Sequence, residues 1–399
     1  MKKERFKISL FNITFIVFAI GSIFWPFTKI TGISTFYPSL ALIIVYVFIY
    51  RINILFKWSV ISTLLLYIVL IMYDVLGHFR DVKEVHLYPF GVFNFVFPFF
   101  LSAVVIELLI ANKDSNALYF FGRFSLYIIV FTSIMSIIYE IMNPTGARVV
   151  MQDDMGNYIV NFTFSGIYGL SFVMSGIVGI RKKIDVSDVI IYGLFVTALL
   201  MSAFLTNIVF ALGLVLMAII FRINPKNIFI YIIVMICVLL FIISNVGVLV
   251  DLLPQLPGAN KSDYALKAMQ IADISQYHDK GAILLIRQEV YALSYESFIK
   301  NMFFGSGSWE SIAEHSFWLD KLGFIGLFGS SFFLFSIYMI YKRSVSIIDI
   351  EHRGLYRIII ATLLLLLFFN PFYDKEFWLI IFVYTPLIMV YYINRARIS

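Results

Sequence analysis

The sequence has little charge, one cysteine and few histidines, and each shortage excludes a class of protein. Only 14% of the 399 residues are charged, whereas soluble domains contain about 25%. A single cysteine excludes a disulfide framework. Five histidines, scattered and without paired cysteines, argue against a structural zinc site, and we expect neither a metal nor another cofactor.

Apolar residues take the place of charge. They make up 61% of the chain, and the mean hydropathy is +0.93. This composition excludes an ordinary soluble enzyme and could furnish on the order of 12 bilayer-spanning helices of about 20 residues each. We therefore expect an all-α, polytopic integral membrane protein with residues 1–399 in a single membrane domain. A net charge of +6 would suggest a nucleic-acid partner for a soluble chain, but in a membrane protein its placement matters more, and we expect none.

Apolar runs bounded by charges mark the expected spans. The run 188–221 is interrupted at Thr206 and Asn207, which predicts a tight hairpin of two short helices, and the eleventh run is short enough to be partly re-entrant. The expected spans are 8–27, 34–50, 58–73, 88–110, 124–142, 159–180, 188–205, 207–221, 227–250, 316–341, 357–370 and 376–393.

Along this series, loops rich in lysine and arginine alternate with loops that contain few of them. The loops rich in these residues follow the even-numbered spans, as at Arg51 and Lys57 or at 181–183, and the basic N-terminal tail falls on the same side. Because positive charge is retained in the cytoplasm, this pattern predicts that both termini are cytoplasmic.

The segment 251–315, between the ninth and tenth expected spans, is too long and too apolar for an ordinary loop. We expect a partly helical outer loop, with an amphipathic helix from Ala282 onward. Its apolar face would hold Ile283, Ile286, Val290 and Leu293. A second face would carry Arg287, Tyr291 and Tyr295, and Glu296 with Lys300 would form an i,i+4 ion pair.

Few ionisable groups fall at membrane depth: Glu107, Glu140, Asp320 and Lys321. Such groups are candidates for function by default, but these do not form the carboxylate chain or paired broken helices of an ion-coupled transporter. Asp320 and Lys321 are sequence neighbours, so on a helix they cannot face each other.

The expected outer face carries a second set of candidate residues, different from those at membrane depth. Arginine matches phosphate oxygens, aromatic rings suit sugars, and histidine can accept a hydroxyl proton near neutral pH. Each residue also has an ordinary explanation, such as a carbonyl contact for the histidine or a salt bridge for an arginine. The set comprises Arg80, Lys83, Arg148, Arg287, Tyr291, Tyr295, Trp309 and His315.

The stretch from Arg287 to Gly329 resembles the membrane O-antigen polymerase and ligase superfamily. That family carries an arginine in a large outer loop, an NPxxGxG element and a run of the form HNxxLxxLxxxGxxG. Here the first element reads NMFFGSG, and the second reads HSFWLDKLGFIGLFG. The matching positions are Gly305, Gly307, His315, Leu319, Leu322 and Gly326, and Gly323 is a further glycine within the run; Met302 replaces the proline and Ser316 the asparagine.

The resemblance implies a metal-independent, inverting glycosyltransferase of the bacterial cytoplasmic membrane, active on its outer face. The donor would be a glycan on undecaprenyl diphosphate, and the acceptor the terminal sugar of a lipid-linked repeat unit of O-antigen, capsule or exopolysaccharide. Arg287 would neutralise the diphosphate, His315 would act as general base, and Glu310 or Glu314 could orient it or replace it. A flippase and a chain-length regulator are the implied protein partners.

One departure bears on the type of transferase. Family members, the ligases above all, often carry TxSR at the hairpin of the seventh and eighth spans, where this chain has SAFLTN with Asn207 in the arginine's place. Arg148, Arg80 or Lys83 would then supply the second positive charge, or Arg287 alone would hold the donor. This favours a polymerase over a ligase, and a flippase of the same lipid-linked material remains an alternative. Arg287 and His315 are 28 residues apart, so they can meet only if the chain reverses, which a turn at Gly305, Ser306 and Gly307 would allow.

Overall fold

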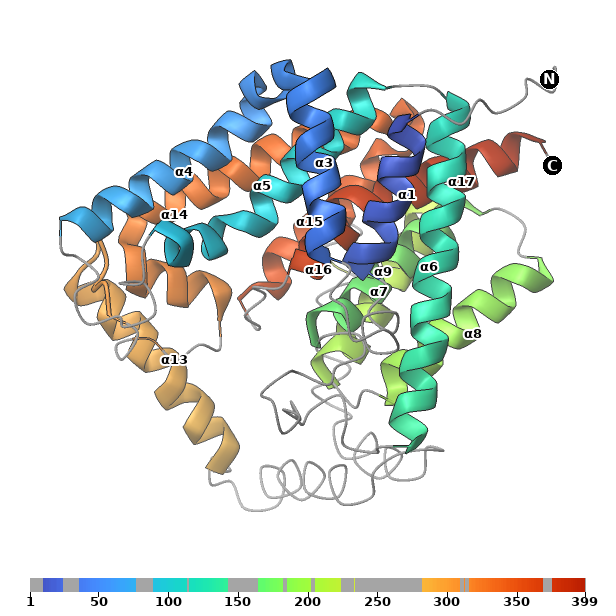
Figure 1. Ribbon diagram of the computed structural model, residues 1–399. Coiled ribbons are helices and arrows are strands. Elements are labelled where there is room, and N and C mark those ends of the chain that lie inside the picture. Colours follow the sequence, from blue (N-terminus) through green and yellow to red (C-terminus); the bar gives the residue numbers. More distant parts are fainter. Residues whose placement is uncertain are drawn as a thin grey trace.

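The fold is an all-helical bundle throughout the part of the chain that the computed structural model describes (Figure 1). The described residues are 10–23, 36–76, 89–112, 115–142, 164–181, 185–201, 205–223, 233, 282–308, 312, 316–368 and 375–398. The principal helices are α1 (Leu10–Ile23), α3 (Phe36–Tyr50), α4 (Trp58–Val75), α5 (Pro89–Ala111), α6 (Ser115–Met142), α7 (Phe164–Ile180), α8 (Val186–Met201), α9 (Leu205–Ile223), α13 (Ala282–Lys300), α14 (Phe317–Ser344), α15 (Arg353–Leu366), α16 (Lys375–Leu379) and α17 (Thr385–Ile398).

Among the described residues, four helices are long and apolar enough to cross a membrane: Trp58–Val75, Asn116–Ile138, Phe317–Ile347 and Glu376–Arg397. Six shorter apolar helices accompany them. All but one of the expected spans overlap a described helix, and the exception, 227–250, lies outside the described residues apart from 233. The all-helical, apolar character is thus confirmed, while the number and direction of crossings stay predictions.

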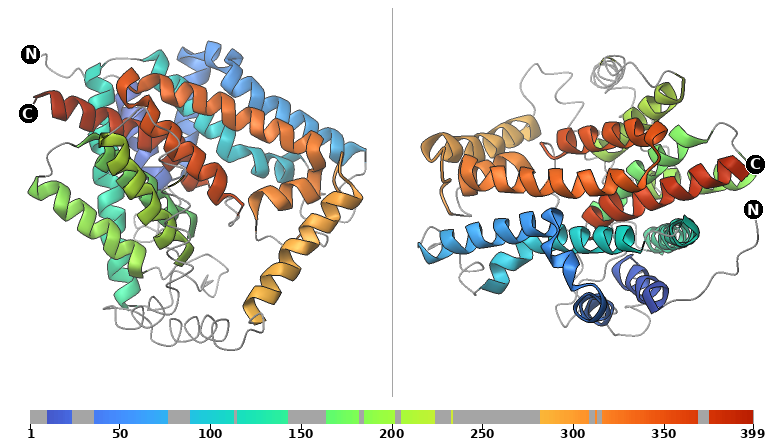
Figure 2. Two further views of the ribbon diagram at one scale, coloured as in Figure 1. Left: turned by 180° about the vertical axis from the view of Figure 1, so that it is seen from behind. Right: turned by 90° about the horizontal axis from the view of Figure 1, so that it is seen from above.

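The helices form layers around the last helix of the chain. Seen from above, α14 and α17 occupy the middle, α4, α5 and α6 lie on one side, and α15 with the green α7, α8 and α9 lies on the other (Figure 2). α1 and α3 pack together outside α6. Residues from Phe377 to Leu387 in the central helix are almost fully buried, as expected for a helix that is apolar all round.

The central helix contains a π-helical turn, Ile380–Tyr384, between α16 and α17. The amide of Thr385 donates to the carbonyl of Ile380, five residues back, instead of four. The next donor in that pattern would be residue 386, which is a proline without an N–H. The Ile381 carbonyl that it would have served accepts a hydrogen bond from the Tyr356 hydroxyl of α15 at 3.0 Å.

Two expected boundaries differ in the structure. The break between the seventh and eighth expected spans was predicted at Thr206 and Asn207, but both belong to α9, which begins at Leu205. Polar residues are common in the first turn of a helix, so they mark its start and not the turn before it. The tenth span was expected as one continuous helix over 316–341; α14 is interrupted at Gly326, where φ is +64°.

Glu107 in α5, whose expected depth in the membrane made it a candidate for function, instead forms part of a structural ion pair. Both of its carboxylate oxygens accept from Arg343 of α14, at 2.6 and 2.7 Å, and Ser59 of α4 also donates to it. A bidentate pair of this kind fixes the relative position of three helices.

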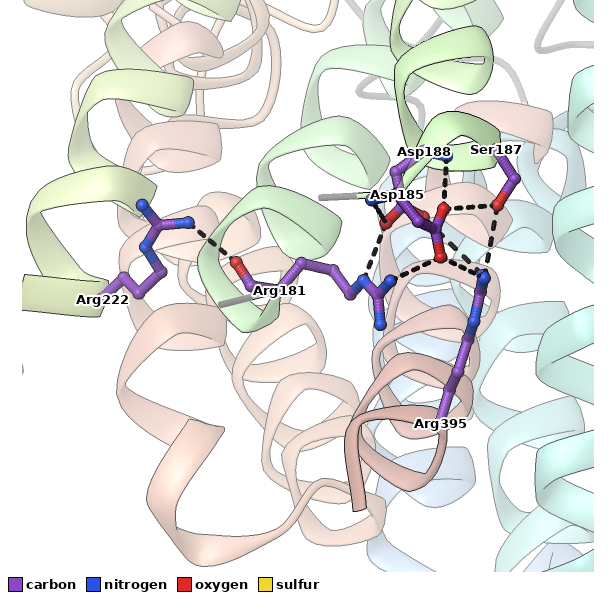
Figure 3. Close-up of polar contacts among 6 residues, drawn as sticks. All are labelled: Arg181, Asp185, Ser187, Asp188, Arg222 and Arg395. Atoms are coloured by element: carbon purple, nitrogen blue, oxygen red, sulfur yellow. Dashed lines mark hydrogen bonds and ion pairs between the residues drawn. The ribbon is translucent and has the colours of Figure 1, made fainter. Parts of the chain in front are cut away.

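A second group of charged residues, here named the arginine clasp, joins α7, α8, α9 and α17 (Figure 3). Asp185 and Asp188 cap the start of α8 reciprocally, each accepting the other's backbone N–H. Arg181 at the end of α7 donates to Asp188 at 2.8 Å and to Asp185 at 2.7 Å. Arg395 of α17 reaches the same two carboxylates, and Arg222 of α9 donates to the Arg181 carbonyl at 2.8 Å.

The clasp connects basic turns that the sequence pattern assigned to one side of the membrane. Arg397 pairs with Asp349 at 2.9 Å, and Arg51 donates to Asn112 at 3.1 Å, so further turns of that set are also in contact in pairs. Asp188 has no exposed surface, whereas Asp349 and Arg397 are both half exposed. Loss of the buried pair should therefore destabilise the protein more than loss of the exposed pair.

We expect Asp188→Ala to destabilise the protein by about 3–5 kcal/mol, because it removes the fully buried carboxylate that pairs with the buried Arg181. Asp349→Ala, which removes an exposed pair, should cost less than about 1 kcal/mol. Thermal unfolding of both purified variants in one detergent measures the difference. Equal loss in the two variants would contradict the assignment of Asp188 as the centre of the clasp.

Stability should also depend on Asp185 at low pH. The hydrogen bond from Ser187 is the largest cause that lowers the Asp185 pKa, from 3.8 to about 2, with the Asp188 amide, Arg395 and Arg181 adding to it. A lowered pKa stabilises the fold above the unfolded value and loses that contribution as pH falls through about 2. The difference in melting temperature between the wild type and Asp185→Asn should therefore be constant above about pH 5 and shrink between about pH 4 and 2. A difference that does not change with pH would contradict this.

Candidate functional site

The candidate site is built around the junction of α13, the turn that follows it, and α14. Gly305, Gly307, Gly323 and Gly326, here named the glycine junction, come from two sequence elements and meet in space. The chain runs along α13, turns at 301–308, and later enters α14 beside α13 (Figure 1). Three of them, Gly305, Gly307 and Gly326, are positions of the two separate motifs that carry the resemblance.

The break in α14 frees backbone groups, and the turn supplies their partners. The Gly323 and Phe324 carbonyls accept from the amides of Ser306 and Gly307, at 2.8 and 2.9 Å. On the other side of the break, the amides of Leu327 and Phe328 donate to the carbonyls of Met302 and Phe303, at 2.9 and 3.0 Å. The turn therefore replaces the helical hydrogen bonds that Gly326 interrupts.

Other helices complete the same set. The Tyr73 hydroxyl of α4 donates to the Ile325 carbonyl at 3.3 Å, and the Ser297 hydroxyl of α13 donates to the Gly323 carbonyl at 3.2 Å. In a membrane, a backbone group left without a partner would cost several kcal/mol, so an interrupted helix requires such contacts.

Glycine is required here for two reasons. Gly305, Gly307 and Gly326 all have positive φ, between 64° and 77°, which disfavours residues with a side chain. A Cβ on Gly305 would also collide with the Phe324 carbonyl group, and one on Gly326 with the Phe303 carbonyl oxygen. The two backbone segments approach closely enough to form hydrogen bonds because Gly305 and Gly326, at the points of contact, carry no side chain.

The break bends α14 sharply. Sixteen residues separate Phe317 from Phe333, which would be about 24 Å along a straight helix. Their ring centroids are 6.2 Å apart, and the Lys321 ammonium lies 5.1 Å from the Phe333 centroid. The residues before Gly326 thus form a short first arm of α14, which packs against the long second arm.

The first arm begins with a set of polar contacts. Ser316 caps α14 by accepting from the Leu319 amide, and its own amide donates to Asp320 at 3.0 Å. The other Asp320 oxygen accepts from the Ser294 hydroxyl of α13 at 2.7 Å. Asp320 and Lys321 are both buried, and the prediction that they do not face each other agrees with these different surroundings.

The face of α13 that packs on α14 continues the predicted one, because Ser294 and Ser297 follow Val290 at i+4 and i+7. The side chains of Ile283, Ile286 and Val290 themselves lie outside the described residues. The packing positions are Ser294 and Ser297, both buried, whereas Leu293 of the predicted apolar face is 43% exposed. Small hydroxyl residues permit close helix approach and donate hydrogen bonds across the interface, as is common between membrane helices. On the predicted second face, Tyr291 is half-buried and Tyr295 is exposed, and the expected Glu296–Lys300 pair is present at 3.5 Å.

The predicted chemical residues are placed only in part. Arg287 lies in α13 as expected, but its side chain is outside the described part of the structure. The others outside it are Arg80, Lys83, Arg148, Trp309, Glu310, Glu314 and His315. The structure therefore brings the glycines together and leaves the meeting of Arg287 with His315 a prediction.

Sequence reasoning missed Ser294, Ser297 and Tyr73. The two serines are three residues apart on a helix, and this small-residue spacing could have indicated a helix interface. Nothing in the sequence around Tyr73 distinguishes it from the other aromatic residues of the spans. Within the described residues, no group of His, Cys, Asp and Glu could hold a metal ion, and metal-free chemistry stays a prediction.

Comparison of the chain with protein-family models and with curated proteins gave no match.

The role of the glycine junction can be tested with a matched glycine. Gly326→Ala should destabilise the protein by at least about 1–2 kcal/mol, because alanine disfavours positive φ and its Cβ meets the Phe303 carbonyl. Gly193→Ala, inside α8 where a Cβ meets nothing within 4 Å, should be neutral or stabilise by about 0.5–1 kcal/mol. The measurement is thermal unfolding in detergent. If Gly326→Ala were as stable as Gly193→Ala, the junction could not be a required contact.

Proposed function

We propose that this protein is a polysaccharide polymerase of a bacterial cytoplasmic membrane. It would transfer a glycan from undecaprenyl diphosphate to the terminal sugar of a lipid-linked repeat unit. The observation that carries the proposal is the glycine junction: Gly305, Gly307 and Gly326 sit at motif positions of the polymerase and ligase superfamily and, with Gly323, form one contact. Motif residues that pack together are better support than the same letters in isolated segments.

The register between α13 and the first arm of α14 also supports the proposal. Ser294 contacts Asp320, and Ser297 contacts Gly323, so the two helices run side by side with a constant offset of 26 residues. The same offset sets Ser316 level with Val290, which lies three residues after Arg287, about 4.5 Å along the helix. His315 directly precedes Ser316 in the sequence. Arg287 and His315 would therefore have to span only a short distance to act in one site.

The proposed reaction breaks the bond between the anomeric carbon of the donor and its phosphate oxygen. The acceptor hydroxyl oxygen forms the new bond to that carbon from the opposite side, and His315 takes the hydroxyl proton as general base. Undecaprenyl diphosphate leaves with the bonding electron pair, and Arg287 neutralises its charge. Arg80, Lys83 and Arg148 are the candidates for a second cation, and Glu310 and Glu314 for orienting His315.

The two tyrosines of α13 are the proposed sugar contacts. Tyr291 is half-buried, and Tyr295, one turn later, is exposed. Aromatic faces suit sugar rings because they offer a large apolar surface at low conformational cost. A bound glycan would then lie over the C-terminal half of α13.

We expect His315→Ala and Arg287→Ala each to leave the amount of membrane-inserted protein unchanged and to abolish long-chain polysaccharide. Lys300→Ala is the matched control, because Lys300 is also a cation of α13 but is exposed and paired only with Glu296 in an i,i+4 contact. It should retain wild-type chain lengths. Gel separation of extracted glycans from a deletion strain carrying each variant is the measurement, and wild-type chains from both site variants would refute the assignment.

The material that accumulates separates the alternatives. A polymerase deletion should accumulate single repeat units on undecaprenyl diphosphate at the outer face. Long chains still on undecaprenyl diphosphate would instead identify a ligase, and repeat units trapped inside the cell would identify a flippase. Either of those results would overturn the polymerase proposal.

A further inference from the structure

The end of α13 and the break of α14 together present an exposed cluster of large apolar side chains. This cluster, here named the aromatic tip, consists of Met302, Phe303, Phe304, Leu327 and Phe328. Phe303 is 58% exposed and Phe304 is 51% exposed. The rings of Phe303 and Phe304 are 4.7 Å apart, and both lie 5.9 Å from Phe328.

The glycine junction holds the aromatic tip in this position. The carbonyls of Met302 and Phe303 accept from the amides of Leu327 and Phe328, so the backbones that carry the rings are bonded to each other. These hydrogen bonds therefore fix the backbone positions from which the rings project. Burial of a large apolar side chain is worth about 1.5–3 kcal/mol, so a rigid patch of this kind in water would be costly.

The aromatic tip is continuous with a membrane helix. α4 is one of the four helices long and apolar enough to cross a membrane, and its Leu65, Ile68, Met72 and Val75 form an exposed apolar stripe at helical spacing. Tyr73, near the end of α4, contacts the rings of Phe304 and Phe328 at 6.1 and 6.4 Å. The tip thus lies at the end of α4, where a lipid-facing stripe would meet the membrane surface.

The direction of α13 fits the same boundary. From the tip, α13 runs crosswise to α4 (Figure 1). If α4 crosses the membrane, α13 lies along its surface. The exposed C-terminal end of α13 is divided accordingly: Ile299 is exposed on one side, and the charged pair of Glu296 and Lys300 occupies the next. An apolar side next to a charged side is typical of a helix at the membrane interface.

We propose that the aromatic tip is a lipid-binding surface, inserted among the acyl chains of the bilayer, and that α13 is an interfacial helix. The sequence had placed the whole segment 251–315 in an outer loop. The tip therefore anchors the end of that loop in the bilayer, next to the first arm of α14. Lipid contact at the tip does not depend on which reaction the protein catalyses.

The test uses nitroxide labels in proteoliposomes of phosphatidylethanolamine and phosphatidylglycerol. Cys237 is the one cysteine of the chain, so Cys237→Ser provides a background for single labels at Phe303→Cys and Phe304→Cys. Glu296→Cys and Lys300→Cys, on the charged side of α13, are the matched controls. Collision with oxygen, which concentrates in the bilayer, is compared with collision with a water-soluble nickel chelate.

We expect the ratio of oxygen to nickel collision to be several-fold higher at positions 303 and 304 than at 296 and 300. A ratio at 303 and 304 equal to that at the controls would mean that the tip is in water, and would overturn the proposal. Low collision with both reagents at 303 and 304 would mean that protein covers the tip, as in a dimer, and would also overturn it. Two labelled positions and unchanged gel-filtration profiles guard against a local effect of one label.

Discussion

The interruption of α14 at Gly326 is possible because three carbonyls before it and two amides after it find partners outside the helix. A helix inside a membrane normally satisfies its own amides and carbonyls, and water is not present to replace a lost bond. Here the turn at 301–308 donates to two carbonyls before the break and accepts from two amides after it. The turn and the bent helix are therefore one structural unit, and neither would be stable in this form without the other.

The π-helical turn of the last helix follows the same rule at a different place. Pro386 removes a donor, and Tyr356 of α15 supplies one to the carbonyl of Ile381. In both places a backbone group that has no hydrogen-bond partner within its own irregular helix bonds to a neighbouring element. The buried carboxylates behave similarly, because Glu107 and Asp188 each join helices through arginine and not through substrate.

The sequence predicts the helices much better than it predicts their interruptions. Apolar length locates α1 through α9 because burial in lipid or protein requires it. Gly326 looks like many other glycines, and its positive φ becomes necessary only when Phe303 approaches it from a remote segment. The roles of Ser294 and Ser297 are hidden in the sequence for the same reason, since the two serines gain their value from Asp320 and Gly323 on another helix.

The distinction between scaffold and chemistry follows from these contacts. The glycines that carry the family resemblance act on backbone geometry, and they would be needed whether the site transferred a glycan, bound a lipid or did neither. What they do is fix the first arm of α14 beside α13 at a constant offset, so that Ser316 and Arg287 belong to neighbouring turns of two parallel helices. The proposed catalytic pair, separated by 28 residues, would need such a rigid frame, because misplacement by about 1 Å can cost about 100-fold in rate. The junction is thus a precondition for the proposed chemistry of Arg287 and His315.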